Sequence, residues 1–241
     1  MSTSLLVVRG VQKSFGAVIA LTSVDLVLHR GERLGIIGPN GSGKTTLINC
    51  ITGLLSPERG RIEFESRDIT HLPTHRRARL GIARTFQIPR PFTGMTVLEN
   101  LLVVLDYVGR AQDRQARAEH VLASVGLGRR RGDDAENLSQ LELRKLELAR
   151  ALVGEPRVLI ADEAMAGLSE AEIDDLLPIL FQLNSAGVSV IMIEHIMHAV
   201  MRFSERIVCF ETGRVIAEGA PEQVANDATV QRVYFGEQSR H

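Results

Sequence analysis

Residues 38–45 read GPNGSGKT and complete the phosphate-loop pattern G-x-x-x-x-G-K-[S/T]. The apolar run Leu34–Ile37 precedes them and predicts a buried strand, and a helix is expected to open at Lys44. This strand–loop–helix context distinguishes a working phosphate loop from a chance match. We therefore expect the segment to bind the phosphates of a nucleotide. The alternative, a glycine-rich turn that binds nothing, does not account for the context.

The chemistry of a phosphate loop explains its residue types. Glycines let the backbone turn so that successive N–H groups point at phosphate oxygens, and the following helix adds its positive dipole end. Lys44 is expected to reach the β- and γ-phosphates, and the Thr45 hydroxyl suits a Mg²⁺ ion. The predicted nucleotide-binding residues of the loop are Gly38, Pro39, Asn40, Gly41, Ser42, Gly43, Lys44, Thr45 and Thr46.

Length and composition restrict the class of protein. A chain of 241 residues, 44% of them hydrophobic, suffices for one large α/β domain or a core domain with an insertion. The net charge of −1 provides no basic field for nucleic acid or anionic lipid. Cys50 and Cys209 lie in apolar stretches, which favours free thiols of a reducing compartment over a disulfide. The chain shows no signal-peptide pattern and no apolar run of the roughly 20 residues that span a bilayer, so we expect any membrane role to depend on a partner.

Two kinds of strand pattern occur along the chain. In the N-terminal third, apolar residues alternate with polar ones around Leu6, Val8, Val24, Leu26 and Leu28, and a short strand is expected through Ile62 and Phe64. Continuous apolar runs predict buried strands of a parallel sheet, with helices between them. These runs are Leu34–Ile37, Val158–Ala161, Val188–Ile193 and Ile207–Phe210.

The middle of the chain, roughly residues 90–155, has a helical pattern instead. The capping-box form S/T-x-x-E precedes expected helices at Thr96–Glu99, at Ser139–Glu142 and, beyond this region, at Ser169–Glu172. Gly109–Arg117 and Gly126–Asp134 are predicted to be solvated connections. The residues thus predict a nucleotide-binding α/β core that is interrupted by a mostly helical insertion.

Two adjacent carboxylates, Asp162 and Glu163, follow the apolar strand Val158–Ala161. Ligands of open α/β sheets bind at the carboxyl ends of the strands. Asp162 would hold Mg²⁺ directly or through water, and Glu163 would polarise the attacking water as a general base. An acidic helix cap is the structural alternative, and the phosphate loop favours the catalytic interpretation.

Three other candidates carry little weight by themselves. His195 follows the strand Val188–Ile193, Gln87 follows an apolar run that ends at Phe86, and Phe15 precedes the phosphate loop. A lone histidine, glutamine or phenylalanine is more often a surface or core residue than a ligand-binding one.

Their order along the chain changes that assessment. Taken together, the motifs resemble the nucleotide-binding subunit of an ABC transporter over nearly the whole chain. These motifs are Phe15, GPNGSGKTT (38–46), Gln87, LSQLELRKLELARAL (138–152), LIADEAMAGL (159–168) and His195. Three segments are similar to the larger ATPase subunit of importers for branched-chain, hydrophobic amino acids: ARTFQIPRPFTGMTVLENL (83–101), IEHIMHAVM (193–201) and IAEGAPEQV (216–224).

The resemblance implies a fold, an activity and partners. The fold would be a single ABC ATPase domain, with a RecA-like P-loop core (1–88 and 155–241), an antiparallel β subdomain at its N-terminal end and a helical subdomain (89–154). ATP and Mg²⁺ are the implied ligands. A second ATPase subunit, two transmembrane permeases and, indirectly, an external binding protein are the implied partners, with no nucleic acid. The chain would then lie peripherally on the cytoplasmic side of the inner membrane.

The resemblance also implies roles for single residues. Phe15 would stack on adenine, Gln87 would sense the γ-phosphate through Mg²⁺ and water, and His195 would position the γ-phosphate and water with Glu163. Subunits of the family dimerise head to tail, so that Ser139 would contact the ATP of the partner. The loop Pro89 to Thr96 would grip the permeases.

The signature segment departs from the usual family form Leu-Ser-Gly-Gly-Gln. Gln140 and Leu141 replace the glycine pair, and Glu142 replaces the glutamine. Either these side chains obstruct the approach to phosphate, or Glu142 completes the Ser139 capping box and points away; we favour the second interpretation. We also hypothesise that the ATP of the partner is hydrolysed more slowly. Ala164 and Ser169 replace the family's usual proline and frequent aspartate, which puts the cross-dimer aspartate contact in doubt.

Other functions of such a cassette remain open from the residues. They are an ATPase of a related export system, a soluble ABC ATPase that acts on DNA or ribosomes, and a non-catalytic nucleotide sensor. One cassette of near-neutral charge disfavours the second, and Glu163 with His195 disfavours the third.

Overall fold

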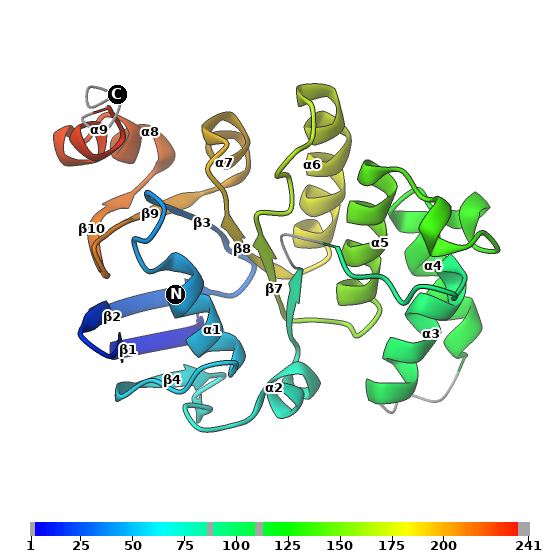
Figure 1. Ribbon diagram of the computed structural model, residues 1–241, viewed down its shortest axis with the longest axis horizontal. Helices are drawn as coiled ribbons and strands as arrows, with labels where there is room; N and C mark the ends of the chain where they lie inside the picture. Colours follow the sequence, from blue (N-terminus) through cyan, green and yellow to red (C-terminus); the bar gives the residue numbers. More distant parts are fainter. Residues whose placement is uncertain (1–2, 86–88, 109–112, 236–241) are drawn as a thin grey trace.

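The computed structural model describes residues 3–85, 89–108 and 113–235, which form two sheets and the helices around them (Figure 1). The larger sheet has six strands in the order β10-β9-β3-β8-β7-β6. All neighbours pair in parallel except β10, which is antiparallel to β9. The strands are β3 (Arg33–Ile37), β6 (Ile82–Thr85), β7 (Val158–Asp162), β8 (Ser189–Ile193), β9 (Arg206–Glu211) and β10 (Arg214–Gly219).

The central strands of this sheet are buried on both faces, as their continuous apolar runs predict. Every residue of β7 and β8 is buried, and so are the last four of β3. Strands that are buried on both faces need a cover on each side. Helices cover one face, and a helix together with the second sheet covers the other. The predicted parallel α/β sheet is therefore confirmed.

A second, antiparallel sheet of four strands has the order β2-β1-β4-β5. Its strands are β1 (Ser4–Phe15), β2 (Val18–His29), β4 (Arg59–Phe64) and β5 (Arg67–Asp68). Leu6 and Val8 are buried on β1, and Val24, Leu26 and Leu28 are buried on β2. The alternation in the sequence thus identified the core-facing side of this sheet.

Two apolar cores lie on opposite faces of the parallel sheet. One fills the space between the two sheets and includes Leu47, Ile48 and Ile51 of α1 (Lys44–Thr52). The other joins the sheet to the remaining helices. Those helices include α6 (Glu170–Ser185), α7 (Met197–Phe203), α8 (Pro221–Ala225) and α9 (Ala228–Phe235), and a short helix α2 (Thr74–Leu80) leads into β6.

Three helices, α3 (Val97–Val108), α4 (Arg114–Ser124) and α5 (Gln140–Leu152), stand together at one end of the molecule (Figure 1). The Thr96–Glu99 box precedes α3, and the Ser139–Glu142 box begins α5. The predicted connection Gly109–Arg117 is wrong in its second part, because α4 begins at Arg114. Most residues of α4 are polar and lie at the surface. Its buried residues are Ala118 and Leu122, which pack the helix against its neighbours.

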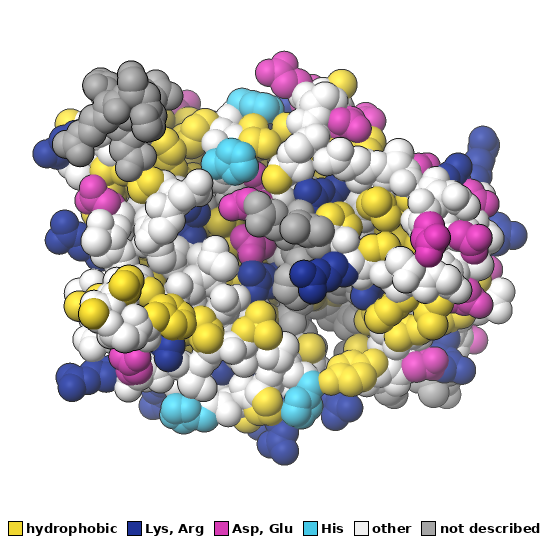
Figure 2. All heavy atoms as spheres, in the orientation of Figure 1, with side chains coloured by type: hydrophobic (Ala, Val, Ile, Leu, Met, Phe, Trp, Pro, Cys, Tyr) yellow, Lys and Arg dark blue, Asp and Glu magenta, His cyan; other side chains and the backbone are white. Residues whose placement is uncertain are grey.

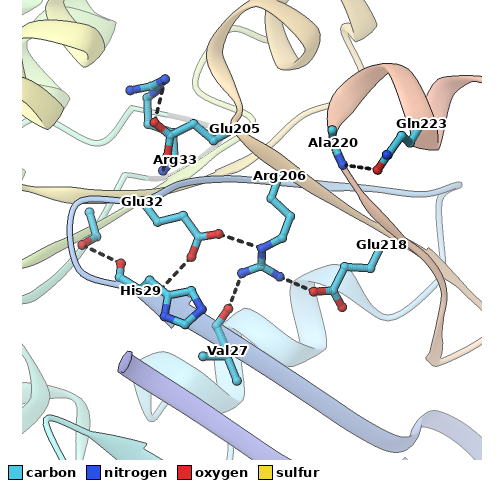
Figure 3. Close-up of polar contacts among 10 residues, drawn as sticks. Val27, His29, Glu32, Arg33, Glu205, Arg206, Glu218, Ala220 and Gln223 are labelled. Carbon is cyan, nitrogen blue, oxygen red and sulfur yellow. Dashed lines mark hydrogen bonds and ion pairs between the residues drawn. The ribbon is translucent and has the colours of Figure 1, made fainter. Parts of the chain in front are cut away.

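Arg206 ties the two sheets together at the ends opposite the phosphate loop (Figure 3). Its guanidinium lies 2.7 Å from Glu32 Oε1, donates to Glu218 Oε1 at 2.5 Å and donates to the Val27 carbonyl at 2.5 Å. Burial alone lowers the pKa of Arg206, but its bonds to Glu32 and Glu218 outweigh burial and raise the pKa. Strands β2, β9 and β10 and the start of β3 therefore meet at one half-buried cation.

The fold class predicted from the sequence is confirmed: an α/β core, an N-terminal antiparallel sheet and a helical part between β6 and β7. The subdomain limits 1–88, 89–154 and 155–241 stay a prediction. Within the described ranges, no helix is both long and apolar enough to cross a membrane.

Candidate active site

The carboxyl ends of three neighbouring strands bring the predicted site residues to one edge of the parallel sheet. In the strand register, Ile36 pairs with Ile193, and Ile193 is also opposite Asp162. The phosphate loop follows β3, Glu163 follows β7, and His195 comes two residues after β8. Because β8 lies between β3 and β7, the loop and the two carboxylates flank the end of β8.

The phosphate loop has a backbone that only glycine fits at two positions. Gly38 has φ +147°, and a Cβ there would come within 2.4 Å of the Phe210 carbonyl oxygen. Gly43 has φ +105°, and a Cβ there would come within 2.5 Å of the Ala20 carbonyl oxygen. Left-handed backbone at Gly43 lets α1 begin at Lys44 with no side-chain cap, so the first-turn N–H groups face the loop.

The polar groups inside the loop suit a phosphate. Lys44 donates from Nζ to the carbonyl oxygens of Gly38, at 2.6 Å, and Pro39, at 3.0 Å. Ser42 Oγ is buried without a hydrogen-bond partner among the described residues. Burial lowers the pKa of Lys44, and the nearby carboxylates of Glu163 and Asp162 partly offset that effect. An ammonium group, an orphan hydroxyl and uncapped helix amides form a donor set for a phosphate anion.

Asp162 is buried at the end of β7 and forms an ion pair with Arg84. The Arg84 guanidinium lies 2.5 Å from Asp162 Oδ2 and donates to Asn49 Oδ1 at 2.7 Å. Arg84 comes from β6, the strand beside β7, and Asn49 comes from α1. The sequence reasoning did not single out Arg84, although its place three residues before Gln87 on a neighbouring strand was a usable signal.

Glu163 adopts a strained backbone conformation beside this ion pair. Its φ of +47° is in the left-handed region, which residues other than glycine seldom occupy. Its N–H donates to the Ile193 carbonyl at 2.9 Å, so the turn after β7 is pinned to β8. The half-buried Glu163 carboxylate interacts electrostatically with Lys44. This places a carboxylate and the loop ammonium at one site.

Glu194 is a buried acid between the two halves of the site, and sequence reasoning missed it. It is 1% exposed, and its Oε1 accepts from the Met165 N–H at 2.8 Å. Burial is the main cause that raises the pKa of Glu194 to about 7; the nearby Glu163 adds to the shift, and Arg144 opposes it. The sequence contains a signal for this residue: a carboxyl group directly before a histidine, just after a wholly buried strand.

The remaining predicted residues occupy three places. Phe15 is 50% exposed at the end of β1, on the hairpin whose second strand contacts Gly43, and Lys13 Nζ lies 5.6 Å from the centre of its ring. Thr45 and His195 are exposed at the site edge, and Thr46 is half-buried. Ser139 lies away from this edge at the start of α5, where it bonds with Glu142. Gln87 lies outside the described residues.

The same grouping of charge is visible on the molecular surface. In Figure 2, acidic side chains (magenta) lie near the middle of the visible face beside Lys or Arg side chains (dark blue). They lie over the region where Figure 1 shows β7 and β8. Charged groups of both signs therefore lie close together on this part of the surface.

Known proteins are similar to this chain along nearly its whole length. BraF of Pseudomonas aeruginosa, a high-affinity branched-chain amino acid transport ATP-binding protein, is 38% identical over 98% of this chain and 100% of its own length. LptB of Acidithiobacillus ferridurans, a lipopolysaccharide export system ATP-binding protein, is 33% identical over 98% of both chains. The crystal structure of the ADP conformation of MJ1267, an ATP-binding cassette of an ABC transporter, matches with a TM-score of 0.90 and 32% identity over 98% of this chain and 100% of that one.

Two family patterns cover different parts of the chain. The pattern described as ABC transporter matches residues 21–166, which contain the phosphate loop and both carboxylates. The pattern described as branched-chain amino acid ATP-binding cassette transporter matches residues 214–239. With these matches and the site geometry, the chain belongs to the ABC transporter family of ATP-binding cassettes and is an ATP hydrolase.

Proposed function

We propose that this chain is the ATP-hydrolysing subunit of an importer for branched-chain or other hydrophobic amino acids. The observation that carries the proposal is the convergence of Lys44, Asp162 and Glu163 at one sheet edge. The relative BraF is named for branched-chain amino acid transport, and the C-terminal family pattern has the same association. Because fold alone does not define a cargo, the amino acid substrate depends on these relatives.

The phosphate loop would bind the triphosphate of ATP. The backbone N–H groups of the loop and of the first turn of α1 would donate to phosphate oxygens, and Lys44 would exchange its two carbonyl partners for the β- and γ-phosphates. Phe15 offers an exposed ring for adenine at the neighbouring hairpin end.

Thr45, Asp162 and Gln87 would hold Mg²⁺, of which the first two are described in the structure. The fit is chemical: a hydroxyl and a carboxylate are hard oxygen ligands, which Mg²⁺ prefers. Asp162 is paired with Arg84, so a cation at this carboxylate would compete with the guanidinium. When bound, Mg²⁺ would neutralise charge on the phosphate oxygens.

Glu163 would act on the attacking water as the general base, and His195 would help to position that water and the γ-phosphate. The pinned turn after β7 holds Glu163 beside β8, and His195 follows β8. A base held in a fixed, strained turn loses little freedom at the moment of reaction. Ser139 would serve the ATP that is bound to a second ATPase subunit.

The proposed assembly has a second ATPase subunit, which is a paralogue or another copy of this chain, and two membrane permeases. An external binding protein would deliver the substrate to the permeases. The chain would then lie on the cytoplasmic face of the inner membrane and contact it through the permeases, with the loop after Gln87 as the contact.

A Glu163→Gln variant tests the hydrolysis mechanism. We expect steady-state turnover to fall about 100-fold or more, because a general base is lost, while ATP affinity stays within about twofold. Lys44→Ala is the matched comparison and should weaken ATP binding itself. Turnover of Glu163→Gln at the wild-type rate would contradict the assigned role.

A transport assay tests the cargo. The chain would be reconstituted in vesicles with a second ATPase subunit, two permeases and a binding protein. ATP-dependent uptake of radiolabelled leucine, isoleucine or valine is the expected result. Outward movement of a lipid-like substrate, as the name of LptB describes for that protein, would instead support an export system.

A further inference from the structure

The C-terminal helix α9 reaches the phosphate loop through one side chain. Tyr234, near the end of α9, accepts a hydrogen bond at its hydroxyl oxygen from the Gly38 N–H, at 2.6 Å. The two residues are 196 positions apart in the chain. In Figure 1, α9 lies beside α8, next to β9 and β10. None of the nucleotide-binding motifs includes this tyrosine.

Gly38 is the residue at which β3 turns into the loop. It is buried, its φ is +147°, and a Cβ would come within 2.8 Å of Ser42 Oγ as well as 2.4 Å of the Phe210 carbonyl oxygen. Its N–H follows the last paired residue of β3, Ile37, and the sheet ladder ends there. A buried N–H must find a partner, and the Tyr234 hydroxyl is that partner.

The other contacts of the loop show what this bond adds. Ser42 accepts a backbone hydrogen bond from Gly213 at 2.9 Å, which fixes the end of the loop to the turn between β9 and β10. At the start of the loop, Lys44 holds the Gly38 carbonyl. Lys44 would give up that carbonyl on binding phosphate, and Tyr234 would then hold Gly38 in its place.

Helix α9 is itself held firmly enough to transmit such a restraint. Val230 and Val233 are buried, and Asp227 Oδ1 accepts from the N–H groups of Thr229, at 2.7 Å, and Val230, at 3.1 Å. Burial is the main cause that raises the pKa of Tyr234 to about 12, so its hydroxyl stays neutral under ordinary conditions.

We propose that Tyr234 is a positioning residue for ATP binding, which holds Gly38 and the start of the phosphate loop in place when Lys44 moves to the phosphates. This inference rests on the proposed function of the loop. Through it, helix α9 takes part in nucleotide affinity without contacting nucleotide.

The test compares Tyr234→Phe with Tyr107→Phe. The chain has two tyrosines and no tryptophan, and Tyr107 is 55% exposed on α3. Both variants lose one hydroxyl, but only Tyr234→Phe frees the Gly38 N–H. We expect KM and Kd for ATP, and Kd for ADP, to rise about five- to tenfold in Tyr234→Phe, which corresponds to one net hydrogen bond, with kcat changed less than about twofold. Tyr107→Phe should match wild type.

A spectroscopic measurement uses the same control variant. In Tyr107→Phe, Tyr234 is the one remaining tyrosine, and its fluorescence should change on addition of ATP. An affinity for ATP equal to wild type in Tyr234→Phe would overturn the inference, even if that variant melts at a lower temperature. Failure of the wild-type protein to bind ATP would instead contradict the proposed function of the loop.

Discussion

Glu163 combines a proposed catalytic carboxylate with a backbone conformation that costs stability. A residue other than glycine at φ +47° lowers the free energy of unfolding by about 1 kcal/mol relative to glycine. We therefore expect Glu163→Gly to raise the free energy of unfolding by about that amount and to abolish ATP hydrolysis. Chemical denaturation and an ATPase assay measure the two effects.

A residue with the same kind of strain, but at an exposed turn, gives the control for this prediction. Ser66 has φ +63° in the turn between β4 and β5. Ser66→Gly should raise the free energy of unfolding by a similar amount, and this variant should still hydrolyse ATP. A destabilised Glu163→Gly variant would mean that the carboxylate contributes more to folding than the strain costs.

Glu194 makes the stability of the protein depend on pH. Its pKa rises from 4.5 to about 7 in the folded state, chiefly through burial, so the folded state binds more protons than the unfolded state between these values. Stability is therefore higher below pH 4.5 and falls as the pH rises to about 7, by an amount on the order of 3 kcal/mol. Glutamine keeps an acceptor for the Met165 N–H but carries no charge, so Glu194→Gln should remove this loss.

Urea unfolding at pH 5 and pH 8 checks the prediction for Glu194. The variant should be more stable than wild type at pH 8, and the difference should shrink towards pH 5. Taking the difference between the two proteins cancels the titration of their other groups. A difference that does not vary with pH would show that Glu194 is already ionised in the folded protein at pH 5.

At the scale of elements, Arg206 is the half-buried cation at which the two sheets meet. Its removal would leave Glu32, a carboxylate with a side chain 10% exposed, without its charged partner and with the His29 N–H as a remaining donor. Breaking a buried pair costs about 3–5 kcal/mol, and we take the lower end of this range because the Arg206 side chain is 20% exposed. We expect Arg206→Met to lose a free energy of unfolding of this size, measured by urea denaturation.

Arg202 provides the comparison for Arg206, because its ion pair with Asp174 has both side chains more than half exposed. Arg202→Met should change stability by less than about 1 kcal/mol. The double variant Arg206→Met/Glu32→Gln should recover part of the loss, since it no longer buries an unpaired charge. Equal losses from the two single arginine variants would contradict the role of Arg206 as a link between sheets.

The elements that the sequence predicts well are those with strong local signals. Continuous apolar runs located β3, β7, β8 and β9, and the S/T-x-x-E boxes located the starts of α5 and α6, both of which have reciprocal cap bonds in the structure. The sequence wrongly predicts a loop at the start of α4. Only two residues of this helix are buried, so its sequence shows no clear apolar period. Local signals therefore suffice where burial is strong.

Contacts between distant elements could not be predicted in the same way. The phosphate loop and the two carboxylates were readable because each follows a strand and parallel strands end at a common edge. The Arg84–Asp162 pair and the Tyr234–Gly38 bond join residues 78 and 196 positions apart, and no periodicity marks them. The place of Glu194 in the site could be predicted only with the strand order, in which β8 lies between β3 and β7.

At the scale of the whole molecule, the signature segment bears on a site outside this chain. Glu142 accepts from the Ser139 N–H at 2.8 Å, and Ser139 Oγ accepts from the Glu142 N–H at 3.3 Å, so the capping interpretation of Glu142 is confirmed. The hydrogen bond from the Ser139 backbone N–H is the main cause that lowers the pKa of Glu142. A Cβ on Gly167 would come within 2.7 Å of Gln140 Nε2, which places that side chain against the turn after β7. The segment is thus ordered, but it lacks the glycines that allow close approach to a phosphate.

In a head-to-tail dimer this segment would cover the ATP of the second subunit, while the ATP of this chain would meet the second subunit's signature. In a dimer with a paralogue, we expect the two sites to be unequal and the site covered by Gln140 and Leu141 to be the slower one. Lys44→Ala in this chain should therefore reduce the turnover of the assembled transporter more than the same change at the equivalent lysine of the second subunit. A difference of about threefold or more corresponds to one weakened contact in the transition state.

The measurement is ATP turnover of the reconstituted transporter with each lysine replaced in turn. A variant with Gln140→Gly and Leu141→Gly in this chain sharpens the test, because it restores close backbone approach only at the second subunit's ATP. Combined with Lys44→Ala, it should raise the residual turnover. Equal losses from the two lysine variants would contradict the asymmetry, and so would a working dimer of two identical chains, in which both sites meet the same signature.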